Sequence, residues 1–476
     1  MVFSSITFLV YFLPLFLLAY HITPNKFKNA CILIFSVIFY AWGGPKFIFV
    51  ILGTTFLDFY LVNAMHNSKT KKAKNQYLII SLAMNLGLLF YFKYCNFFID
   101  NVNALLGADI QWTKVLLPIG ISFYTFESIT YVVDVYRGIH KPLKNFWHYQ
   151  TYIIFFPKLI AGPIVRYHDI ADQITNREKN YTTDIKLSGF FIFCFGLAKK
   201  VIIANIAAEM VAKYMGDKSH VITLTVIHAL SSLEAWVGLI MFALQIYFDF
   251  SGYSDMAIGL GRMFGFHFRE NFEYPYISKS ISEFWRRWHI SLGSIFRDYV
   301  YIPLGGNKKR VYWNLFVVWF LTGMWHGPSW NFIFWGLYFF IFIALEKAFL
   351  QKWLDKSPAF IAHLYALIII IPGWVIFYFT DTQMLAAYVV KMFSFTGSVA
   401  GNGEVLNLLS THLFWLILAL ILCMPVFHVV KKWIDKKVGR IRFYDTAVIG
   451  FNVLLLFICI AQLVGKSYNP FIYFRF

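Results

Sequence analysis

The sequence has few charged residues for its length and lacks the short motifs that mark nucleotide- or metal-dependent soluble enzymes. Only 14% of its residues are charged, which is low for a soluble domain. It contains no Walker-type or G-x-G-x-x-G phosphate loop and no H-E-x-x-H or C-x-x-C metal set. A G-x-S-x-G elbow, the mark of many serine hydrolases, is also absent. The sequence therefore predicts no bound metal and no resident cofactor.

Cysteine is scarce as well, and its spacing excludes a disulfide framework. The five cysteines are an odd number, are scattered along the chain and lie mostly in apolar runs. They are Cys31, Cys95, Cys194, Cys423 and Cys459. We interpret them as inert buried thiols.

Apolar residues make up most of the chain. Hydrophobic residues account for 59% and aromatic residues for 21%, whereas soluble domains are typically about 45–50% apolar. Apolar runs of about 20 residues recur and predict membrane helices. The first run, Phe8–Tyr20, lacks an A-x-A-like exit, so we expect an uncleaved span. Neither a tandem repeat nor a linker appears, which predicts a single all-α polytopic membrane domain over residues 1–476.

The net charge of +18 reflects membrane orientation in our interpretation and does not indicate nucleic-acid binding. Loops 21–28, 66–76 and 136–147 carry nine Lys and Arg residues, and the intervening loops carry three. Short basic loops lie on the cytosolic side of a membrane. The pattern predicts a multi-pass protein of the cytoplasmic (inner) membrane, in contact with the lipid bilayer, with its N-terminus outside.

Several polar or small side chains interrupt the apolar runs. Tyr124, Glu127, Tyr131 and Asp134 share one helical face, which fits either a structural network or the lining of a cavity. Pro157, Gly162 and Pro163 break a short run and predict a re-entrant segment. Two further features lie on the apolar run of residues 221–265: Gln245 and Asp249 share a helical face, and Ala257, Gly261 and Gly265 form a small-residue ridge suited to close helix packing.

Residues 278–335 contain the two histidines of greatest interest. Ser280 and Glu283 form a capping box that opens an amphipathic helix, expected to continue through Tyr299 and to lie at the membrane interface. His289 lies at the edge of its apolar stripe. After a Gly-Gly-basic turn, His326 lies within a membrane-grade apolar run, where an ionisable side chain is costly and usually paired or functional. The residues alone do not decide whether each histidine is a paired interior residue or a functional one.

Five segments of this chain closely resemble the membrane-bound O-acyltransferase family. They read PIGISFYTFESITYVVDVYRG, FFPKLIAGPIVRY, QIYFDFSGYSDMAIGLGRMFGF, EFWRRWHISLGSIFRDYVYIPLGGN and LTGMWHGPSWNFIFWG. The likeness is greatest to the bacterial branch for alginate and peptidoglycan O-acetylation, which also includes the teichoic-acid D-alanylation protein. It extends from the first span to the C-terminal FIYFRF.

The resemblance implies a ring of about 11–13 transmembrane or re-entrant helices around a central tunnel. The family's catalytic histidine matches His326, and its second characteristic polar residue matches His289. With an ordinary pKa of about 6.5, histidine can remove a hydroxyl proton near neutral pH. His326 would be the general base, and His289 would orient the thioester or stabilise the oxyanion. Candidate residues for the donor site or tunnel lining are Trp285, Arg286, Trp288, Trp325, Gln245, Asp249 and Glu127.

The resemblance also implies the partners. The donor would be acyl-CoA (acetyl-CoA) or an acyl carrier protein on the cytosolic side, and the acceptor an extracytoplasmic polysaccharide such as alginate or peptidoglycan. The C-terminal FIYFRF resembles an F-x-Y-x-x-F ending whose Tyr473 would relay the acyl group to an extracytoplasmic acyltransferase partner. Alternatively, Tyr473 is an aromatic interface anchor.

Two other functions remain open from the sequence. One is D-alanyl transfer from a carrier protein to teichoic acid. The other, a polytopic transporter, would also explain intramembrane Asp, Glu and His, but transporters often show matching Gly/Pro breaks in two halves. Only one such break cluster, at residues 157–163, appears in this sequence.

Overall fold

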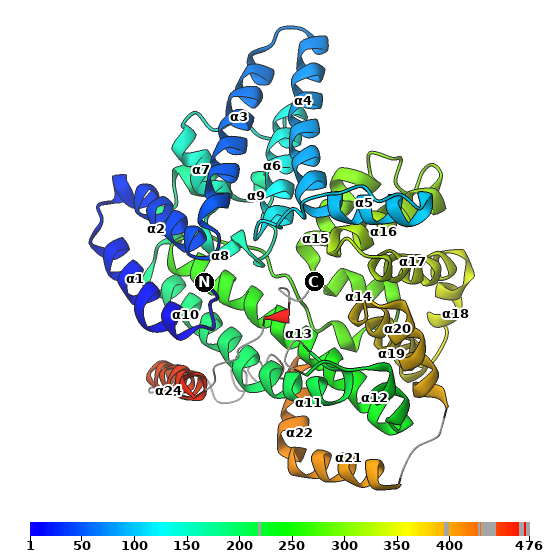
Figure 1. Cartoon of the computed structure of the whole chain (residues 1–476). Helices are drawn as coiled ribbons and strands as arrows, with labels where there is room; N and C mark the ends of the chain where they lie inside the picture. Colours follow the sequence, from blue (N-terminus) through cyan, green and yellow to red (C-terminus); the bar gives the residue numbers. More distant parts are fainter. Residues whose placement is uncertain (218–219, 395–398, 427–428, 430–443, 466–470, 473–476) are drawn as a thin grey trace. The chain divides into compact units, whose positions relative to one another are not determined.

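The computed structural model describes the chain except residues 218–219, 395–398, 427–428, 430–443, 466–470 and 473–476 (Figure 1). The described residues form helices and connecting segments and contain no β-strand, which confirms the predicted all-α class. They divide into two compact units. Unit 1 comprises residues 1–193, 253–270 and 294–300, and unit 2 comprises residues 194–252, 271–293 and 301–476. The prediction of a single domain is not tested by this division and stays a prediction.

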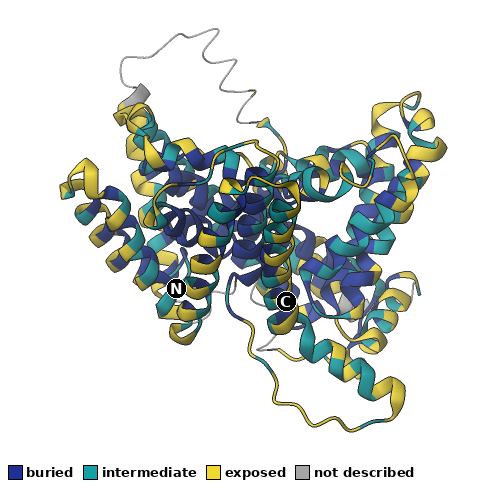
Figure 2. Ribbon diagram, turned by 90° about the horizontal axis from the view of Figure 1, so that it is seen from above, coloured by how far each residue is buried: buried dark blue, intermediate teal, exposed yellow. Residues whose placement is uncertain are grey.

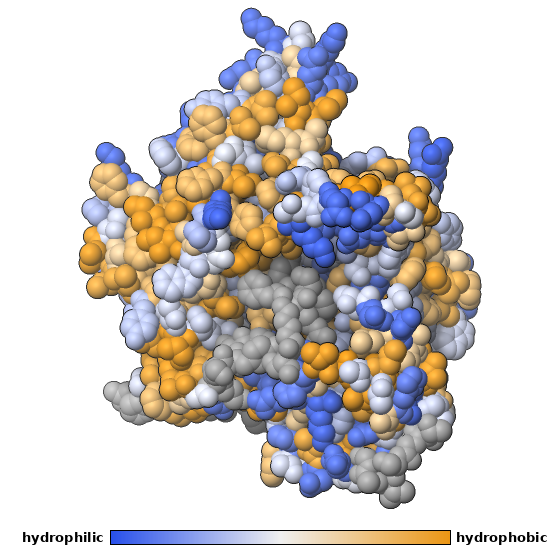
Figure 3. Space-filling view, in the orientation of Figure 1, coloured by the Kyte–Doolittle hydropathy of each residue, from blue (hydrophilic) through white to orange (hydrophobic). Residues whose placement is uncertain are grey.

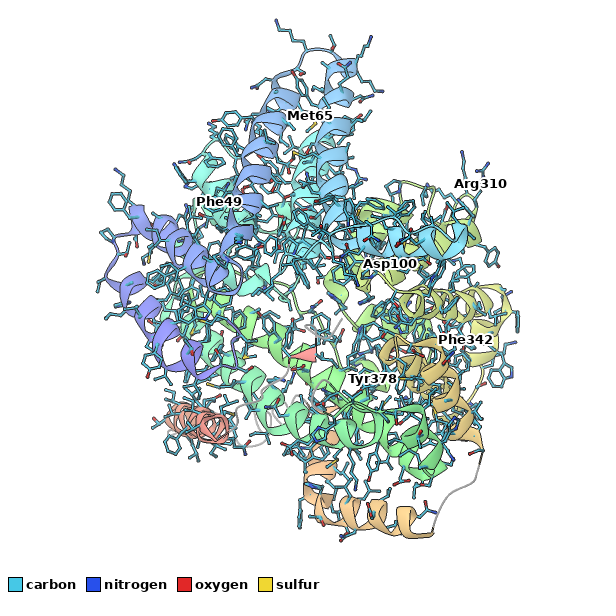
Figure 4. The ribbon with its side chains drawn as sticks, in the orientation of Figure 1. Phe49, Met65, Asp100, Arg310, Phe342 and Tyr378 are labelled. Atoms are coloured by element: carbon cyan, nitrogen blue, oxygen red, sulfur yellow. The ribbon has the colours of Figure 1, made fainter. Side chains whose placement is uncertain are left out.

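Unit 1 holds the N-terminal helices. They are α1 (Leu13–Ile22), α2 (Lys28–Gly43), α3 (Ile48–Asn67), α4 (Lys71–Leu89), α5 (Cys95–Leu106), α6 (Ile121–Tyr136), α7 (Phe146–Ile154), α8 (Phe156–Leu159) and α9 (Tyr167–Thr175). Helix α3 packs beside α4 as a hairpin. In Figure 4, Phe49 and Met65 mark the two ends of α3. The tip of the hairpin is hydrophilic and the stretch beneath it is largely apolar (Figure 3), as expected of helices that leave a membrane at a lysine-rich loop.

Unit 2 holds most of the remaining helices. They are α11 (Asn205–Met215), α12 (Leu224–Ala229), α14 (Ile281–Arg287), α16 (Val311–His326), α17 (Trp330–Leu345), α18 (Gln351–Leu354), α19 (Ala359–Tyr378), α20 (Thr382–Phe393), α21 (Val399–Thr411), α22 (Leu413–Leu422) and α24 (Tyr444–Val464). Three helices pass from one unit into the other: α10 (Thr183–Ala198), α13 (Ser232–Met263) and α15 (Ile290–Ile295).

Seven helices among the described residues are long and apolar enough to cross a membrane, and an eighth would come from the bent pair Asn402–Thr411 and Leu413–Leu422. Figure 2 shows buried residues along one side of many helices and exposed ones along the other. Many exposed side chains are large and apolar, including Phe49 and Leu116, both 75% exposed. Such surfaces suit lipid, which confirms a multi-pass membrane protein. The ring, its tunnel and the count of 11–13 helices stay predictions.

The chain between α7 and α9 is broken, as its proline and glycine residues predict. After α7 and the four-residue helix α8, residues 160–166 leave the helical conformation. Gly162 packs so closely on the backbone of Pro157 and Lys158 that a Cβ atom there would lie 2.6 Å from the Lys158 Cα. Residues 155–167 are all buried, which satisfies the condition for irregular backbone at membrane depth.

The expected small-residue ridge on α13 is only part of the close packing found there. Within unit 1, the tightest approach joins Gly259 of α13 to Gly189 of α10. A Cβ on Gly189 would lie 2.6 Å from the Gly259 carbonyl oxygen. Of the three residues of the expected ridge, Gly261 lies under the ring of Phe268 and Ala257 lies against Gly162. Interfaces of this kind let membrane helices approach through their backbones.

The continuous amphipathic helix expected from Ser280 to Tyr299 is wrong. Helix α14 ends at Arg287, Trp288 is extended, and His289 has the left-handed φ of 46° before α15 begins. The physical reason is pairing with a segment distant in sequence. The Glu273 N–H donates to the Arg287 carbonyl, and the Ile290 N–H donates to the Asn271 carbonyl. These bonds replace the helical bonds that the backbone would otherwise make.

Candidate active site

His326 is the last residue of α16, directly before the turn into α17. The two helices pack through glycines, because a Cβ on Gly323 would collide with the Phe332 carbonyl oxygen and one on Gly336 with that of Trp319. Gly327, which follows His326, has an extended φ of −175°, and the Phe332 ring occupies the space of its absent side chain. The Trp-His-Gly motif therefore fixes a tight corner with His326 on it.

The His326 ring is half-buried and surrounded by aromatic rings. Its centroid lies 5.1 Å from that of Trp325, 4.9 Å from that of Trp335 and 5.1 Å from that of Phe377, each at a steep interplanar angle. The last turn of a helix carries the negative end of its dipole, which favours a positive charge there by about 0.3–1 kcal/mol. The position at the end of α16 therefore favours the imidazolium that forms when His326 takes a proton.

His289 is more deeply buried, with 2% of its surface exposed. Its ring packs edge-on against Phe250 at 4.7 Å and lies 5.8 Å from the Trp325 ring. The Nδ1 atom lies 3.2 Å from Asn271 Oδ1, whereas Nε2 has no hydrogen-bond partner among the described residues. Burial lowers the pKa of His289 to about 3, so the ring is neutral at neutral pH.

The two histidines converge on one indole ring, because Trp325 contacts both of them. Aromatic contacts then extend from His326 through Trp335 to Trp285, whose centroids are 5.2 Å apart. Trp374 lies 4.9 Å from Trp288 and 6.3 Å from Trp335. We call this group the His–Trp cluster; it consists of Trp285, Trp288, His289, Trp325, His326, Trp335, Trp374 and Phe377.

Helix α14 presents Trp285 to the cluster and is held at its start by two carboxylates. The Ser280 hydroxyl accepts the Glu283 N–H, which confirms Ser280 as the N-cap, and Glu283 accepts the N–H of Lys279 instead of that of Ser280. A second carboxylate, that of the buried Glu346, accepts the N–H groups of Ile281 and Ser282 at 2.6 and 2.9 Å. Negative charge at a helix N-terminus is favourable, so Glu346 fixes the position of α14.

The neighbouring arginines of α14 differ in their contacts. Arg287 donates to Glu283 at 3.0 Å and to the Glu273 carbonyl at 3.1 Å. Arg286 is exposed and makes no hydrogen bond or ion pair with the described part of the chain. Arg287 therefore braces the broken helix, and the guanidinium of Arg286 faces outward.

Two further candidates, Gln245 and Asp249, lie on α13 within unit 2. Asp249 is fully buried, forms an ion pair of 2.8 Å with Lys200 and accepts the Ile472 N–H at 2.6 Å. The buried Gln245 has no partner for its Oε1 atom among the described residues. Tyr473 lies outside the described residues.

Glu127 belongs to unit 1 and has a different environment. It is fully buried, pairs with the Lys158 ammonium, and accepts the Val165 N–H at 3.4 Å. On the same face of α6, Asp134 accepts hydrogen bonds from Tyr299 and His168. For this face of α6 the sequence left two alternatives open, a structural network and the lining of a cavity. These contacts favour the structural network.

Metal binding has no support in the described part of the chain, where no three His, Cys, Asp or Glu side chains gather closely enough to hold an ion. The described side chains of the site are two imidazoles, indoles and other aromatic rings. Such a site can take a proton from a hydroxyl and bind an apolar acyl chain.

The fold is that of a multi-pass helical membrane protein, and comparison with known families identifies its class. The chain belongs to the membrane-bound O-acyltransferase family, whose model matches residues 140–389, and it is an O-acyltransferase. That range includes every residue of the His–Trp cluster, both histidines among them.

Three relatives show which members of the family the chain is similar to. The chain is 38% identical to the probable alginate O-acetylase AlgI of Pseudomonas putida, over the full length of both proteins. It is 33% identical to the peptidoglycan O-acetyltransferase of Helicobacter pylori, over 79% of this chain and 77% of that protein. The teichoic acid D-alanyltransferase of Bacillus subtilis is more distant, at 28% over 50% of this chain and 60% of that protein.

Five residues of the site escaped sequence reasoning. Trp335, Trp374 and Phe377 carry no signal beyond an aromatic residue in an apolar span. Asn271 lies in a polar loop, and Glu346 lies at the end of an apolar run. A single acidic residue at such a place in a span was a signal for Glu346, although its partners on α14 could not be inferred.

Proposed function

We propose that this chain moves an acetyl group from a cytosolic thioester across the membrane toward hydroxyl groups of an extracytoplasmic polysaccharide such as alginate or peptidoglycan. The observation that carries the proposal is the convergence of His289 and His326 on Trp325. The full-length similarity to a probable alginate O-acetylase supports acetyl as the group and a surface polymer as its destination.

In the proposed reaction, a hydroxyl oxygen attacks the thioester carbonyl carbon, a C–O bond forms and the C–S bond breaks. His326 takes the hydroxyl proton, and the leaving thiolate is protonated in turn. The half-buried ring at the end of α16 suits a group that must gain charge during the reaction. His289, which is buried and neutral, supports the reaction by orienting the thioester or by stabilising the oxyanion.

The proposal includes a direction. The donor, acetyl-CoA or an acyl carrier thioester, arrives from the cytosol, where the exposed Arg286 faces outward on the helix that also carries Trp285. The protein lies in the cytoplasmic membrane with its N-terminus outside. An extracytoplasmic acyltransferase partner completes delivery to the polymer.

Tyr473 is proposed as an acyl relay between the membrane site and that partner. Support comes from the residues before it: Phe471 and Ile472 are buried, and the Ile472 N–H donates to Asp249. The end of the described chain is thus anchored in unit 2. Mass spectrometry of the C-terminal peptide, from cells lacking the partner, should find an acyl group on Tyr473; its consistent absence contradicts the relay.

D-alanyl transfer from a carrier protein is the alternative within the family. It ranks behind acetyl transfer because the match to teichoic acid D-alanyltransferases has a lower identity and covers less of the chain. Mass analysis of the group on the modified polymer distinguishes acetyl from D-alanyl directly, and finding D-alanyl would replace the acetyl proposal.

The test of the proposed base is His326→Ala. Positioned base catalysis typically contributes about 10²–10⁴-fold, so acyl transfer to polymer should fall by about that factor while the protein remains folded and inserted. His412→Ala is the matched control, since His412 is another half-buried histidine of unit 2 beside a single tryptophan. Unchanged acylation in His326→Ala contradicts the role of His326 as the general base.

A further inference from the structure

The surroundings of His289 are built by a segment that packs against the break between α14 and α15. Asn271 is 1% exposed, and its carbonyl accepts the Ile290 N–H at 2.9 Å. Its side-chain oxygen lies within 3.2 Å of three atoms: the Ser291 N–H at 3.0 Å, the Ser291 hydroxyl at 2.9 Å and His289 Nδ1 at 3.2 Å. One amide thus touches the histidine and the residue two positions after it.

The chemistry of these contacts assigns the protons. A backbone N–H can only donate, so the amide atom facing Ser291 N must be the oxygen of Asn271 and not its nitrogen. An oxygen acceptor 3.2 Å from His289 Nδ1 requires that Nδ1 carry the proton, because two lone pairs would otherwise face each other. A neutral imidazole with a proton on Nδ1 has a bare lone pair on Nε2.

In the described part of the chain, the Nε2 atom is one of the unsatisfied buried atoms of the site, together with Asn271 Nδ2 and the indole nitrogens of Trp285 and Trp335. His289 Nε2 is buried and has no partner among the described residues, although buried polar atoms are usually paired. The groups packed on the ring from α13, residues 271–272, α15 and α16 are Phe250, Asn271, Phe272, Ser291 and Trp325. None of these ionises; the nearest ionisable group in the same set of contacts is His326, whose ring touches the Trp325 indole.

We infer that Asn271 is a positioning residue that holds His289 in the Nδ1–H tautomer, so that Nε2 acts as a hydrogen-bond acceptor during acyl transfer. The inference rests on the proposed function of the histidine pair and chooses between its two supporting roles. An oxyanion needs a hydrogen-bond donor, which a bare Nε2 is not. Orienting the thioester needs only an acceptor for an N–H group of the donor, such as the amide N–H that pantetheine thioesters carry near the sulfur.

Strain in the backbone accompanies this arrangement. His289 adopts a left-handed φ of 46°, a conformation that is strained for a residue other than glycine and is typical of functional sites. The bonds from Ile290 and Ser291 to Asn271 hold that conformation. The same amide therefore sets both the direction of the ring and its proton.

The first arm of the experiment observes the tautomer itself. Protein labelled with ¹⁵N-histidine is placed in lipid bilayers at neutral pH, and the His289 signals are assigned by their loss in His289→Gln. The wild type should show Nδ1 protonated and Nε2 bare, and Asn271→Leu should populate the other tautomer. A wild-type ring protonated on Nε2, or no change in Asn271→Leu, overturns the inference whether or not the chain transfers acetyl groups.

The second arm follows the kcat of transfer from acetyl-CoA. Asn271→Leu should lower kcat about tenfold to a hundredfold, by analogy with orienting partners of metal-bound histidines. Asn271→Asp keeps the acceptor oxygen for His289 Nδ1 and should recover part of the kcat that Asn271→Leu loses. Asn314→Leu, which removes another buried amide bonded to two backbone carbonyls, is the control and should leave kcat unchanged.

The outcomes of the two arms separate the claims. Activity absent in the wild type, with the expected tautomer shift in Asn271→Leu, contradicts the proposed function and leaves the positioning role standing. Normal wild-type activity with an unchanged kcat in Asn271→Leu overturns the role of the Nε2 lone pair in the reaction.

Discussion

Two sets of buried polar groups differ in whether they have partners. In unit 1 the two carboxylates of α6 are paired: Glu127 with Lys158, and Asp134 with Tyr299 and His168. In the His–Trp cluster of unit 2, His289 Nε2 and the indole N–H groups of Trp285 and Trp335 have no partner among the described residues. Paired groups stabilise a fold, whereas buried groups without partners are tolerated where a ligand completes them. We therefore assign a structural role to the paired groups of unit 1 and propose a functional role for the groups of the His–Trp cluster.

Breaking the pair of unit 1 should give the largest effect on stability. Lys158→Met leaves the Glu127 carboxylate buried without its ion pair, which typically costs about 3–5 kcal/mol. The thermal midpoint of the purified protein should fall steeply, and the yield of folded protein with it. Adding Glu127→Leu removes the orphaned charge and should restore most of the loss; a double variant as unstable as the single one contradicts the structural role.

A substitution where α16 packs on α17 should alter the site by displacing α16, which carries His326. Gly323→Ala forces a methyl group against the Phe332 carbonyl, and overpacking of this kind costs about 1–3 kcal/mol. Because α16 carries His326, acyl transfer per folded molecule should also fall. Gly87→Ala on α4 is the control, since a Cβ there meets open space. Equal effects of the two substitutions on transfer would contradict the argument.

Acid should weaken the protein through His289. Its pKa is lowered by burial to about 3 from an ordinary value of 6.5, so below pH 6.5 the unfolded chain binds a proton that the folded chain does not. The stabilising contribution is complete above pH 6.5 and declines as the pH falls toward 3, by about 2 kcal/mol between pH 7 and pH 5. Thermal midpoints across this range should fall less in His289→Gln than in the wild type.

Arg286 should give the smallest effect on stability. It is exposed and makes no bond with the described residues, so Arg286→Gln should change the free energy of unfolding by less than about 0.5 kcal/mol. If the guanidinium attracts an anionic donor, the KM for acetyl-CoA should rise and the effect should shrink at high salt. Arg287→Gln, which loses its bonds to Glu283 and Glu273, should destabilise more; the reverse order would contradict the assignment of the two arginines.

Local signals in the sequence predicted the fold class and singled out the two histidines as candidates. Apolar runs predicted the helices, the Pro-Gly cluster predicted the break before α9, and the capping box predicted the start of α14. Each of these depends on residues a few positions apart. His326 and His289 were singled out by motif and by setting, and the structure brings both to Trp325.

Contacts between distant residues account for the rest. The break at Trp288 arises from pairing with residues 271–273, and no periodicity within the helix reveals it. The Glu346 carboxylate caps α14 from a segment distant in the sequence. The Asn271 amide likewise sets the His289 tautomer from another segment. The Gly189 and Gly259 contact likewise requires knowing which helices meet.

The most direct test of the central claim is an experimental structure of the protein with a non-hydrolysable thioether analogue of acetyl-CoA. The account predicts the acyl end of the analogue among the rings of the His–Trp cluster, with its carbonyl within reach of His326 and an N–H group of its arm on His289 Nε2. An analogue bound with its acyl end at the Glu127–Lys158 pair, or away from both histidines, would contradict it.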